Sequence, residues 1–337
     1  QSLMYLERQP SFSIGPDNEE TENVSLAQSA ALSQDAMRVQ KTALQASNAA
    51  ANMVPQGGLF WDGRADTLQD QALAPLLDAR EMDGGSIETV AGKLRRTSYA
   101  ARFTQLFGDS VWSDVHLTVT EALFAVARYQ VEARSFHPYT SKFDAFLAGK
   151  AKLNEAEMRG LELFNDEKKG NCAACHISQR AKDGSPPQFS DFGLIALGVP
   201  RNRALPINKD PKYYDLGACG PERKDLKGQS EYCGIFRTPS LRNVATRKVF
   251  FHNGIYHSLD EAVRFYVQRD TNPEKFYPTV HGKVQKFDDL PKRYWANVNT
   301  EPPFDRKPGE KPALDEAEIK DVVAFLNTLT DGYQAGK

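Results

Sequence analysis

The sequence predicts a mostly α-helical fold made of two units, residues 1–150 and residues 151–337. Length favours two units, because one hydrophobic core rarely organises as many as 337 residues. Apolar residues recur at helical spacing in several segments, whereas no strand-rich block and no internal repeat is visible. The strongest pattern closes the chain, where apolar residues follow i, i+3, i+4 and i+7 at Ile319, Val322, Val323 and Leu326.

Local signals predict three helices in the first unit. Apolar residues at i, i+4 and i+8 indicate a helix over 66–80. Thr118 and Glu121 have the spacing of a capping box, which predicts a helix from there to about residue 128. A third helix is expected near 140–148, where a glycine ends it.

The first 58 residues have an unusual composition. Residues 2–6 (Ser-Leu-Met-Tyr-Leu) are apolar enough to belong to a core. A polar turn follows around residues 16–18, and an Ala/Ser/Gln-rich segment runs from about 25 to 52. That segment permits a helix but is only weakly amphipathic, so we expect a surface insertion there.

Composition excludes several functional classes. Hydrophobic residues make up 40% and charged residues 26% of the chain, which is ordinary for a globular protein. A net charge of −2 gives no support for binding nucleic acid or a membrane surface. No apolar run reaches the roughly eighteen residues of a membrane span. Gln1 opens the sequence without a signal segment, so we expect a processed or truncated product.

The stretch Cys172-Ala173-Ala174-Cys175-His176 carries the clearest chemistry. Two cysteines three positions apart, followed directly by histidine, form the pattern that attaches a c-type haem. Each thiol adds to one haem vinyl group, and the histidine becomes the proximal iron ligand. A zinc half-site would require two more ligands, and a thioredoxin-like motif would sit in a βαβ context. Helical sequence precedes this motif, so covalent haem is the favoured interpretation.

A short helix before the motif supports this interpretation. Met158, Leu161 and Phe164 mark it, and the helix predicted at the end of the chain is its natural partner. Two such helices cross in a cytochrome c domain, and Gly160 could allow their close approach.

Haem attachment to such motifs takes place outside the bacterial cytoplasm, so the sequence predicts a periplasmic protein. Cys219 and Cys233 are the two cysteines outside the haem motif. In an oxidising compartment, two such cysteines suggest a disulfide.

The second axial ligand of the haem iron is harder to assign. The last of the five methionines is Met158, so none follows His176. Ser258 and Glu261 predict a capped helix that presents Tyr266 inward, where a core tyrosine is the simpler interpretation. Other downstream candidates are His252, His257, His281 and several tyrosines.

Several stretches together resemble the bacterial dihaem cytochrome c peroxidases, including the MauG branch. They extend over nearly everything from residue 59 to residue 331. They are Phe60-Trp61-Asp62-Gly63-Arg64, then Leu68, Gln71-Ala72, Pro75 and Glu81-Met82, then Gly160 to Phe164 with the haem motif, Phe236 to Asn243, Phe251-His252-Asn253-Gly254, and Leu259 to Val263.

The resemblance implies roles for individual residues. Tyr266 falls where the peroxidases have a methionine ligand and MauG-like members a tyrosine, which makes it the expected second ligand beside His176. A phenolate favours ferric and higher iron states and lowers the potential. Gln71 and Glu81 match the polar residues above the peroxide-binding haem, where a carboxylate can move a proton between the peroxide oxygens. Trp61 matches the tryptophan between the two haems.

Two departures from the family pattern stand out. Family members carry a first haem motif upstream of a segment like residues 2–6, so we expect an N-terminal piece bearing the peroxidatic haem to be missing from this sequence, which leaves the first unit incomplete. At the interdomain calcium site this chain has Arg247 and Lys248 before Val249-Phe250-Phe251-His252. Backbone carbonyls can still bind Ca²⁺ beside these cations, so calcium is left open as a cofactor.

These observations together predict a periplasmic dihaem oxidoreductase. It would use hydrogen peroxide to oxidise a redox partner through high-valent haem. That partner is a small cytochrome, a cupredoxin, or a protein oxidised on its side chains. The rival hypothesis is a monohaem electron-transfer cytochrome without peroxidase activity. Lys168 and Lys169 could steer a partner, although a solvated loop explains such a pair more simply.

Overall fold

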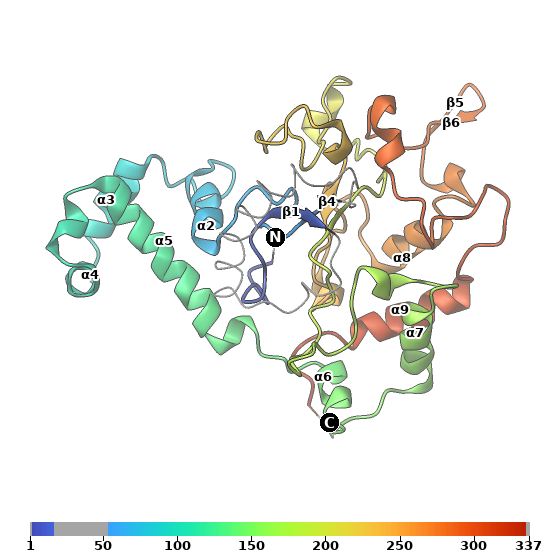
Figure 1. Cartoon of the computed structure of the whole chain (residues 1–337), viewed down its shortest axis with the longest axis horizontal. Coiled ribbons are helices and arrows are strands. Elements are labelled where there is room, and N and C mark those ends of the chain that lie inside the picture. The colour runs from blue at the N-terminus through green and yellow to red at the C-terminus, as the bar shows by residue number, and fades with distance from the viewer. Residues whose placement is uncertain (1, 17–52, 335–337) are drawn as a thin grey trace, which may run out of the picture.

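The computed structural model describes residues 2–16 and 53–334, which are mostly helical with three small two-stranded sheets (Figure 1). The predicted mostly α fold is confirmed at this level. The predicted insertion at 25–52 and most of the turn at 16–18 lie outside the described residues.

The helices are α2 (Leu68–Leu77), α3 (Ile87–Arg95), α4 (Ala100–Phe107), α5 (Val115–Glu132), α6 (Lys142–Leu147), α7 (Glu155–Asn165), α8 (Leu259–Gln268) and α9 (Glu316–Asn327). The strands are β1 (Ser13–Pro16), β2 (Met53–Gln56), β3 (Leu194–Ile195), β4 (Phe236–Arg237), β5 (Thr279–Val280) and β6 (Lys283–Val284). They pair antiparallel as β1–β2, β3–β4 and β5–β6.

Helices α2 to α5 form one group at the left of Figure 1, while α6 to α9 lie together on the right. Helix α5 packs against α2 and α3. Their shared core includes Val90, Ala91, Val119 and Leu123. None of the described helices combines the length and the apolar character needed to cross a bilayer.

The predicted start of α5 is wrong. The helix begins at Val115, because the Asp114 carboxylate accepts a hydrogen bond from the His116 backbone N–H (2.8 Å) and caps the N-terminus. Thr118 is buried inside the first turn, and its hydroxyl donates to the Val111 carbonyl instead (2.5 Å). The helix also continues to Glu132, past the predicted end.

The other predicted helices are confirmed, with small changes at their ends. Helix α2 is shorter than the predicted 66–80 and is capped by Thr67, whose side chain accepts from the Asp70 N–H. In helix α6, Ser141 and Asp144 form a capping box. The predicted box of Ser258 and Glu261 opens α8.

Helices α7 and α9 cross in close contact, as predicted. A Cβ atom added at Gly160 would lie 1.9 Å from the carbonyl oxygen of Asp321 in α9, so only glycine fits there. Phe164 of α7 packs edge-on against Phe325 of α9, with ring centroids 5.1 Å apart. Helix α7 also contacts the turn over Cys172–Ala174. Helices α7 and α9 and this turn all contribute residues to the main hydrophobic core.

Residues 2–16 pack against later parts of the chain. Tyr5 and Leu6 are buried, as predicted for a core segment, whereas Leu3 is 49% exposed. The Tyr5 N–H donates to the Phe136 carbonyl (2.8 Å). Strand β2, the partner of β1, is linked to the region of β3 through a bridge between Gln56 and Gly193.

The predicted disulfide between Cys219 and Cys233 is present. It closes an irregular segment that ends just before β4, and the Ala218 N–H donates to the Ile235 carbonyl across it (3.1 Å). The disulfide therefore fixes the approach of the chain to Phe236 and Arg237.

Candidate haem site

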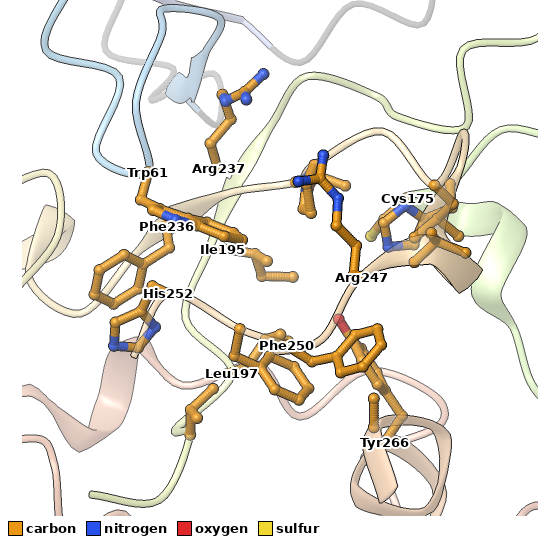
Figure 2. Close-up of a pocket in the computed structure, with 18 of the residues that line it drawn as sticks. Trp61, Cys175, Ile195, Leu197, Phe236, Arg237, Arg247, Phe250, His252 and Tyr266 are labelled. Carbon is orange, nitrogen blue, oxygen red and sulfur yellow. The ribbon is translucent and has the colours of Figure 1, made fainter. Parts of the chain in front are cut away.

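A cavity of about 1370 Å³ lies between the Cys172–His176 segment, β4 and α8. It is larger than the roughly 300–1,000 Å³ of ordinary small-molecule pockets. Figure 2 shows a largely apolar wall that includes Ile195, Leu197 and Phe250.

The two thiols of the motif line this cavity, where a 3-10 turn over Cys172–Ala174 holds them. The turn begins after Asn171, which has a left-handed backbone (φ 46°), and the His176 N–H closes it by donating to the Cys172 carbonyl (2.8 Å). Burial raises the pKa of both thiols to about 12, so they are protonated at neutral pH. Both thiols are free, as addition to haem vinyl groups requires.

The imidazole of His176 is oriented for metal binding. Its Nδ1 lies 2.9 Å from the Phe189 carbonyl, which can only accept, so Nδ1 carries the hydrogen and Nε2 keeps its lone pair. Burial lowers the pKa of His176 to about 4 and keeps the ring neutral. The Nε2 atom of His176 is thus available to bind a metal ion on the wall of the cavity.

Tyr266 reaches the same cavity from α8. Figure 2 shows its hydroxyl directed into the cavity, toward Arg247 and Phe250. Its ring packs between Phe251 (centroids 5.7 Å apart) and Phe304 (5.6 Å). Burial raises the pKa of the phenol, and among the described residues none forms a hydrogen bond with its hydroxyl. A ferric iron would supply the positive charge that a buried phenolate needs.

The alternative histidine ligands have other surroundings. His252 lines the cavity but stacks on Phe236, with ring centroids 3.6 Å apart and planes inclined by 7°. His257 also lines the cavity, but it is exposed and its Nδ1 lies 3.3 Å from the Lys248 carbonyl. His281 is exposed in the β5–β6 turn and does not line the cavity. Tyr266 is therefore better placed than any of them.

Trp61, Gln71 and Glu81 do not lie together. Trp61 lines the cavity, and Figure 2 places it near Phe236, across the cavity from Cys175. Gln71 is buried in α2, whereas Glu81 is exposed in the turn after that helix. Neither of the two lines the large cavity. Of the residues predicted to act in catalysis, the structure brings only Trp61 to the candidate haem ligands.

Arg237 is a cavity residue for which the sequence predicted no role. Its guanidinium donates to the Phe60 carbonyl (3.2 Å) and to Gln9 Oε1, and no described carboxylate pairs with it. Burial lowers its pKa to about 10, so the side chain stays charged. A half-buried cation at the edge of an apolar cavity suits an anionic group such as a haem propionate. Two thiols, a neutral imidazole, a phenol and this cation together fit a covalently bound haem.

Comparison with known proteins identifies the family. The family model for di-haem cytochrome c peroxidase matches residues 8–152. The methylamine utilization protein MauG of Paracoccus denitrificans is 31% identical over 293 residues, which cover 83% of this chain and 70% of MauG. The crystal structure of the diheme peroxidase BthA from Burkholderia thailandensis matches with a TM-score of 0.76 and 41% identity, over 82% of this chain and 67% of BthA. Cytochrome c551 peroxidase of Nitrosomonas europaea is 27% identical over 223 residues, covering 64% of this chain and 57% of that protein.

The chain therefore belongs to the di-haem cytochrome c peroxidase/MauG family and is a peroxidase-type haem oxidoreductase. This confirms the resemblance inferred from the sequence motifs. The chain spans about two thirds of the lengths of MauG and BthA.

Proposed function

We propose that this protein acts in the periplasm as a dihaem oxidoreductase that uses hydrogen peroxide to oxidise a redox partner. One observation carries the proposal: a phenol without a described hydrogen-bond partner, Tyr266, lines the same cavity as His176 and two free thiols. The chain then comprises an N-terminal unit, residues 1–150, on the side of the peroxide-binding haem, and a C-terminal unit, residues 151–337, with its own haem.

In this proposal the chain's own residues hold one haem. Cys172 and Cys175 would attach it covalently, His176 Nε2 and the Tyr266 oxygen would bind its iron, and Arg237 would pair with a propionate. When bound, the haem would supply an iron that holds oxidising equivalents. The phenolate keeps the iron potential low, because a hard anionic oxygen stabilises the ferric state more than a thioether does.

The peroxide side involves a second haem, as the family implies. Glu81 acts there as the acid–base group that takes a proton from one peroxide oxygen and delivers it to the other. Gln71 positions peroxide by hydrogen bonding, and Trp61 carries electrons between the two haem sites. Of these three residues, only Trp61 lines the cavity proposed for the haem at Cys172–His176. The roles of Gln71 and Glu81 rest on the family motif.

The redox partner is a protein. A low-potential haem is a poor acceptor for an ordinary electron-carrier cytochrome or cupredoxin, so side chains of a protein substrate are the favoured reductant.

Two other features predicted from the sequence have minor parts in the proposal. Lys169 Nζ donates a hydrogen bond to Glu318 Oε1 (2.5 Å), so Lys168 is the exposed cation of the lysine pair. Calcium is not part of the proposal, because Arg247 and Lys248 lie in the segment where the family binds it.

A haem count on the native protein tests the proposal. Pyridine haemochrome analysis should give two haems c per molecule, and added peroxide should change the haem spectrum. Tyr266→Met should raise the reduction potential, and Tyr266→His should shift the ferric spectrum. One haem per molecule and no reaction with peroxide would instead support a monohaem electron-transfer cytochrome.

A further inference from the structure

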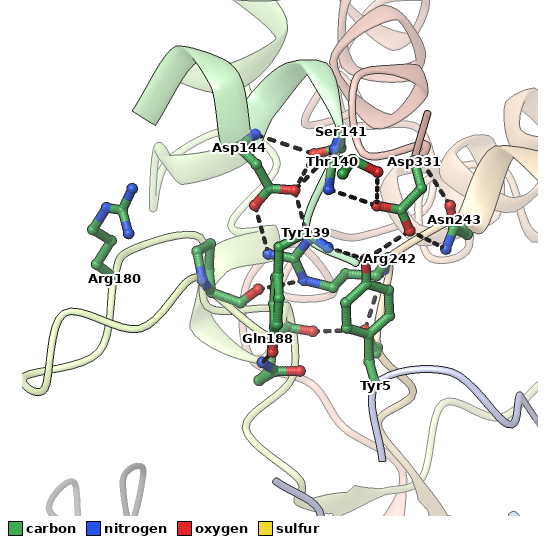
Figure 3. Close-up of polar contacts among 12 residues, drawn as sticks. Tyr5, Tyr139, Thr140, Ser141, Asp144, Arg180, Gln188, Arg242, Asn243 and Asp331 are labelled. Carbon is green, nitrogen blue, oxygen red and sulfur yellow. Dashed lines mark hydrogen bonds and ion pairs between the residues drawn. The ribbon is translucent and has the colours of Figure 1, made fainter. Parts of the chain in front are cut away.

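Two tyrosines, Tyr5 and Tyr139, are in edge contact beside a network of polar side chains (Figure 3). Tyr5 lines the cavity and is buried, while Tyr139 is half-buried. Their ring centroids are 5.0 Å apart, and the planes are inclined by 64°. The pair therefore forms a continuous aromatic contact that starts at the cavity wall.

Each phenol donates a short hydrogen bond to a carboxylate. The Tyr5 hydroxyl donates to Asp331 Oδ2 and the Tyr139 hydroxyl to Glu7 Oε1, both at 2.6 Å. Among the described residues, these are the two tyrosine hydroxyls that bond to a carboxylate. Burial is the main cause that raises the pKa of both phenols, so both keep their protons in the resting protein.

Arg242 lies over both rings, with its guanidinium carbon 4.8 Å from the Tyr5 centroid and 4.5 Å from that of Tyr139. A cation there opposes a positive charge on either ring. Asp144 balances it through two hydrogen bonds of 3.0 Å, as Figure 3 shows. Either phenol can therefore lose an electron readily only if its proton leaves at the same time.

Glu7 has spare capacity to take that proton. Its second oxygen, Oε2, is buried and forms no hydrogen bond with any described residue. The nearest basic group is His137, whose Nδ1 lies 4.0 Å away and is itself buried without a described hydrogen-bond partner. Glu7 accepts a hydrogen bond from the Tyr139 phenol and faces the His137 imidazole, so it is well placed to accept the phenol proton.

We propose that Tyr5 and Tyr139 form a proton-coupled electron relay between the cavity and the surface; its use in turnover rests on the proposed function above. An oxidising equivalent that originates from peroxide and reaches the cavity takes one electron from Tyr5, and the phenol proton moves to Asp331. Tyr139 then reduces the Tyr5 radical, and its own proton moves to Glu7 while the Tyr5 proton returns from Asp331. An external reductant finally gives one electron to Tyr139, and Glu7 returns the proton.

If the two tyrosines had a purely structural role, Glu7→Gln would be expected to have a different effect. The same hydrogen bonds tie residues 5–7 to residues 139 and 331. For that role a glutamine at position 7 serves as well as the glutamate, because its amide oxygen also accepts from the phenol. A glutamine cannot take up the phenol proton, so Glu7→Gln separates the two roles.

The decisive experiment is photo-oxidation by a ruthenium complex in solution, with electron paramagnetic resonance as the readout. We expect a tyrosyl radical in the wild type, its loss in Tyr139→Phe, and a strongly reduced yield in Glu7→Gln. Tyr129→Phe is the matched control, since Tyr129 is 62% exposed and donates to no described carboxylate. A radical yield in Glu7→Gln equal to that of the wild type overturns the relay.

Peroxide added to the haem-loaded protein then tests the link to the cavity. The same radical should form, and Tyr5→Phe should abolish it while leaving the photochemical radical at Tyr139 in place. A haem spectrum that responds to peroxide without any tyrosyl radical overturns the relay. A spectrum that does not respond refutes the proposed function instead, and the relay is then judged by photo-oxidation alone.

Discussion

The helix group α2–α5 and the region around α7, α8 and α9 differ in how they hold the residues predicted to act. Around α7–α9, the thiols, His176 and Tyr266 line one cavity. In the other group, Gln71 is buried within α2 while Glu81 lies in an exposed turn. The candidate haem-attachment site is thus assembled by buried contacts within this chain, whereas the peroxide-side residues are assigned by the family motif alone.

The largest expected effect is on haem attachment. Replacing Cys172 and Cys175 together by alanine should abolish covalent haem attachment to residues 1–337, because no other free thiol is available among the described residues. Gln71→Ala, in the other region, should leave that haem in place and lower only peroxide turnover. Intact mass and pyridine haemochrome analysis separate the two results. Loss of the covalent haem in Gln71→Ala would show that haem attachment also depends on the α2–α5 group.

The second-largest effect is expected on the free energy of unfolding, at the buried ion pair between Asp144 and Arg242. Their side chains are 9% and 1% exposed. Asp144→Ala leaves Arg242 without its counter-charge and should lower the free energy of unfolding by about 3–5 kcal/mol. The control is Asp78→Ala beside α2, where Arg80 is 85% exposed, and no measurable change is expected. Urea denaturation at neutral pH measures both variants.

The same pair predicts a pH dependence. Burial alone would raise the pKa of Asp144, but hydrogen bonds from Arg242 and Ser141 outweigh it and hold the pKa below its usual value. The pair's contribution is therefore complete above the unfolded-state pKa of about 3.9 and is lost as pH falls through the lower folded-state pKa. Urea denaturation of wild type and Asp144→Asn between neutral pH and pH of about 2 should show the difference shrinking in acid. A difference that stays constant over this range would contradict the assignment.

A smaller effect is expected at the α7–α9 crossing. Gly160→Ala should lower the free energy of unfolding by about 2–3 kcal/mol, because the new methyl group overlaps the Asp321 carbonyl. Gly92→Ala in α3 is the matched control: its Cβ would lie 3.8 Å from Arg96 Nη1, and helix propensity should raise stability by up to about 1 kcal/mol. Thermal unfolding of the two variants should therefore shift in opposite directions.

The smallest effect tests the corrected start of α5. Asp114→Ala removes the cap and should lower the free energy of unfolding by about 1 kcal/mol. Glu121→Ala, at the third position of the rejected capping box, should have almost no effect, since the helix already begins at Val115. An equal loss of stability in both variants would instead support the capping box of Thr118 and Glu121 that the sequence predicts.

Local patterns in the sequence were enough to predict most helices and the haem motif. The capping box of Ser258 and the apolar stripe of α9 are local, so they could be predicted without knowing the fold. The start of α5 was missed because Thr118 has a second acceptor, the Val111 carbonyl, that spacing does not reveal.

The candidate site was only partly predictable. The thiols and His176 are adjacent in sequence, and Tyr266 was assigned through the family position. The anion-binding role proposed for Arg237 rests on its place at the cavity and on the lack of a described carboxylate partner, which only the folded chain shows. The bond between Tyr5 and Asp331 joins residues 326 positions apart, and no local pattern predicts such a contact.

That bond also implies an order of events during folding. Tyr5 forms part of the cavity wall, yet its partner Asp331 is made 326 residues later. Contacts between such distant residues close late, because the entropy of the intervening loop must first be overcome. The part of the cavity wall that contains Tyr5 therefore closes late in folding, after local elements such as the turn over Cys172–Ala174.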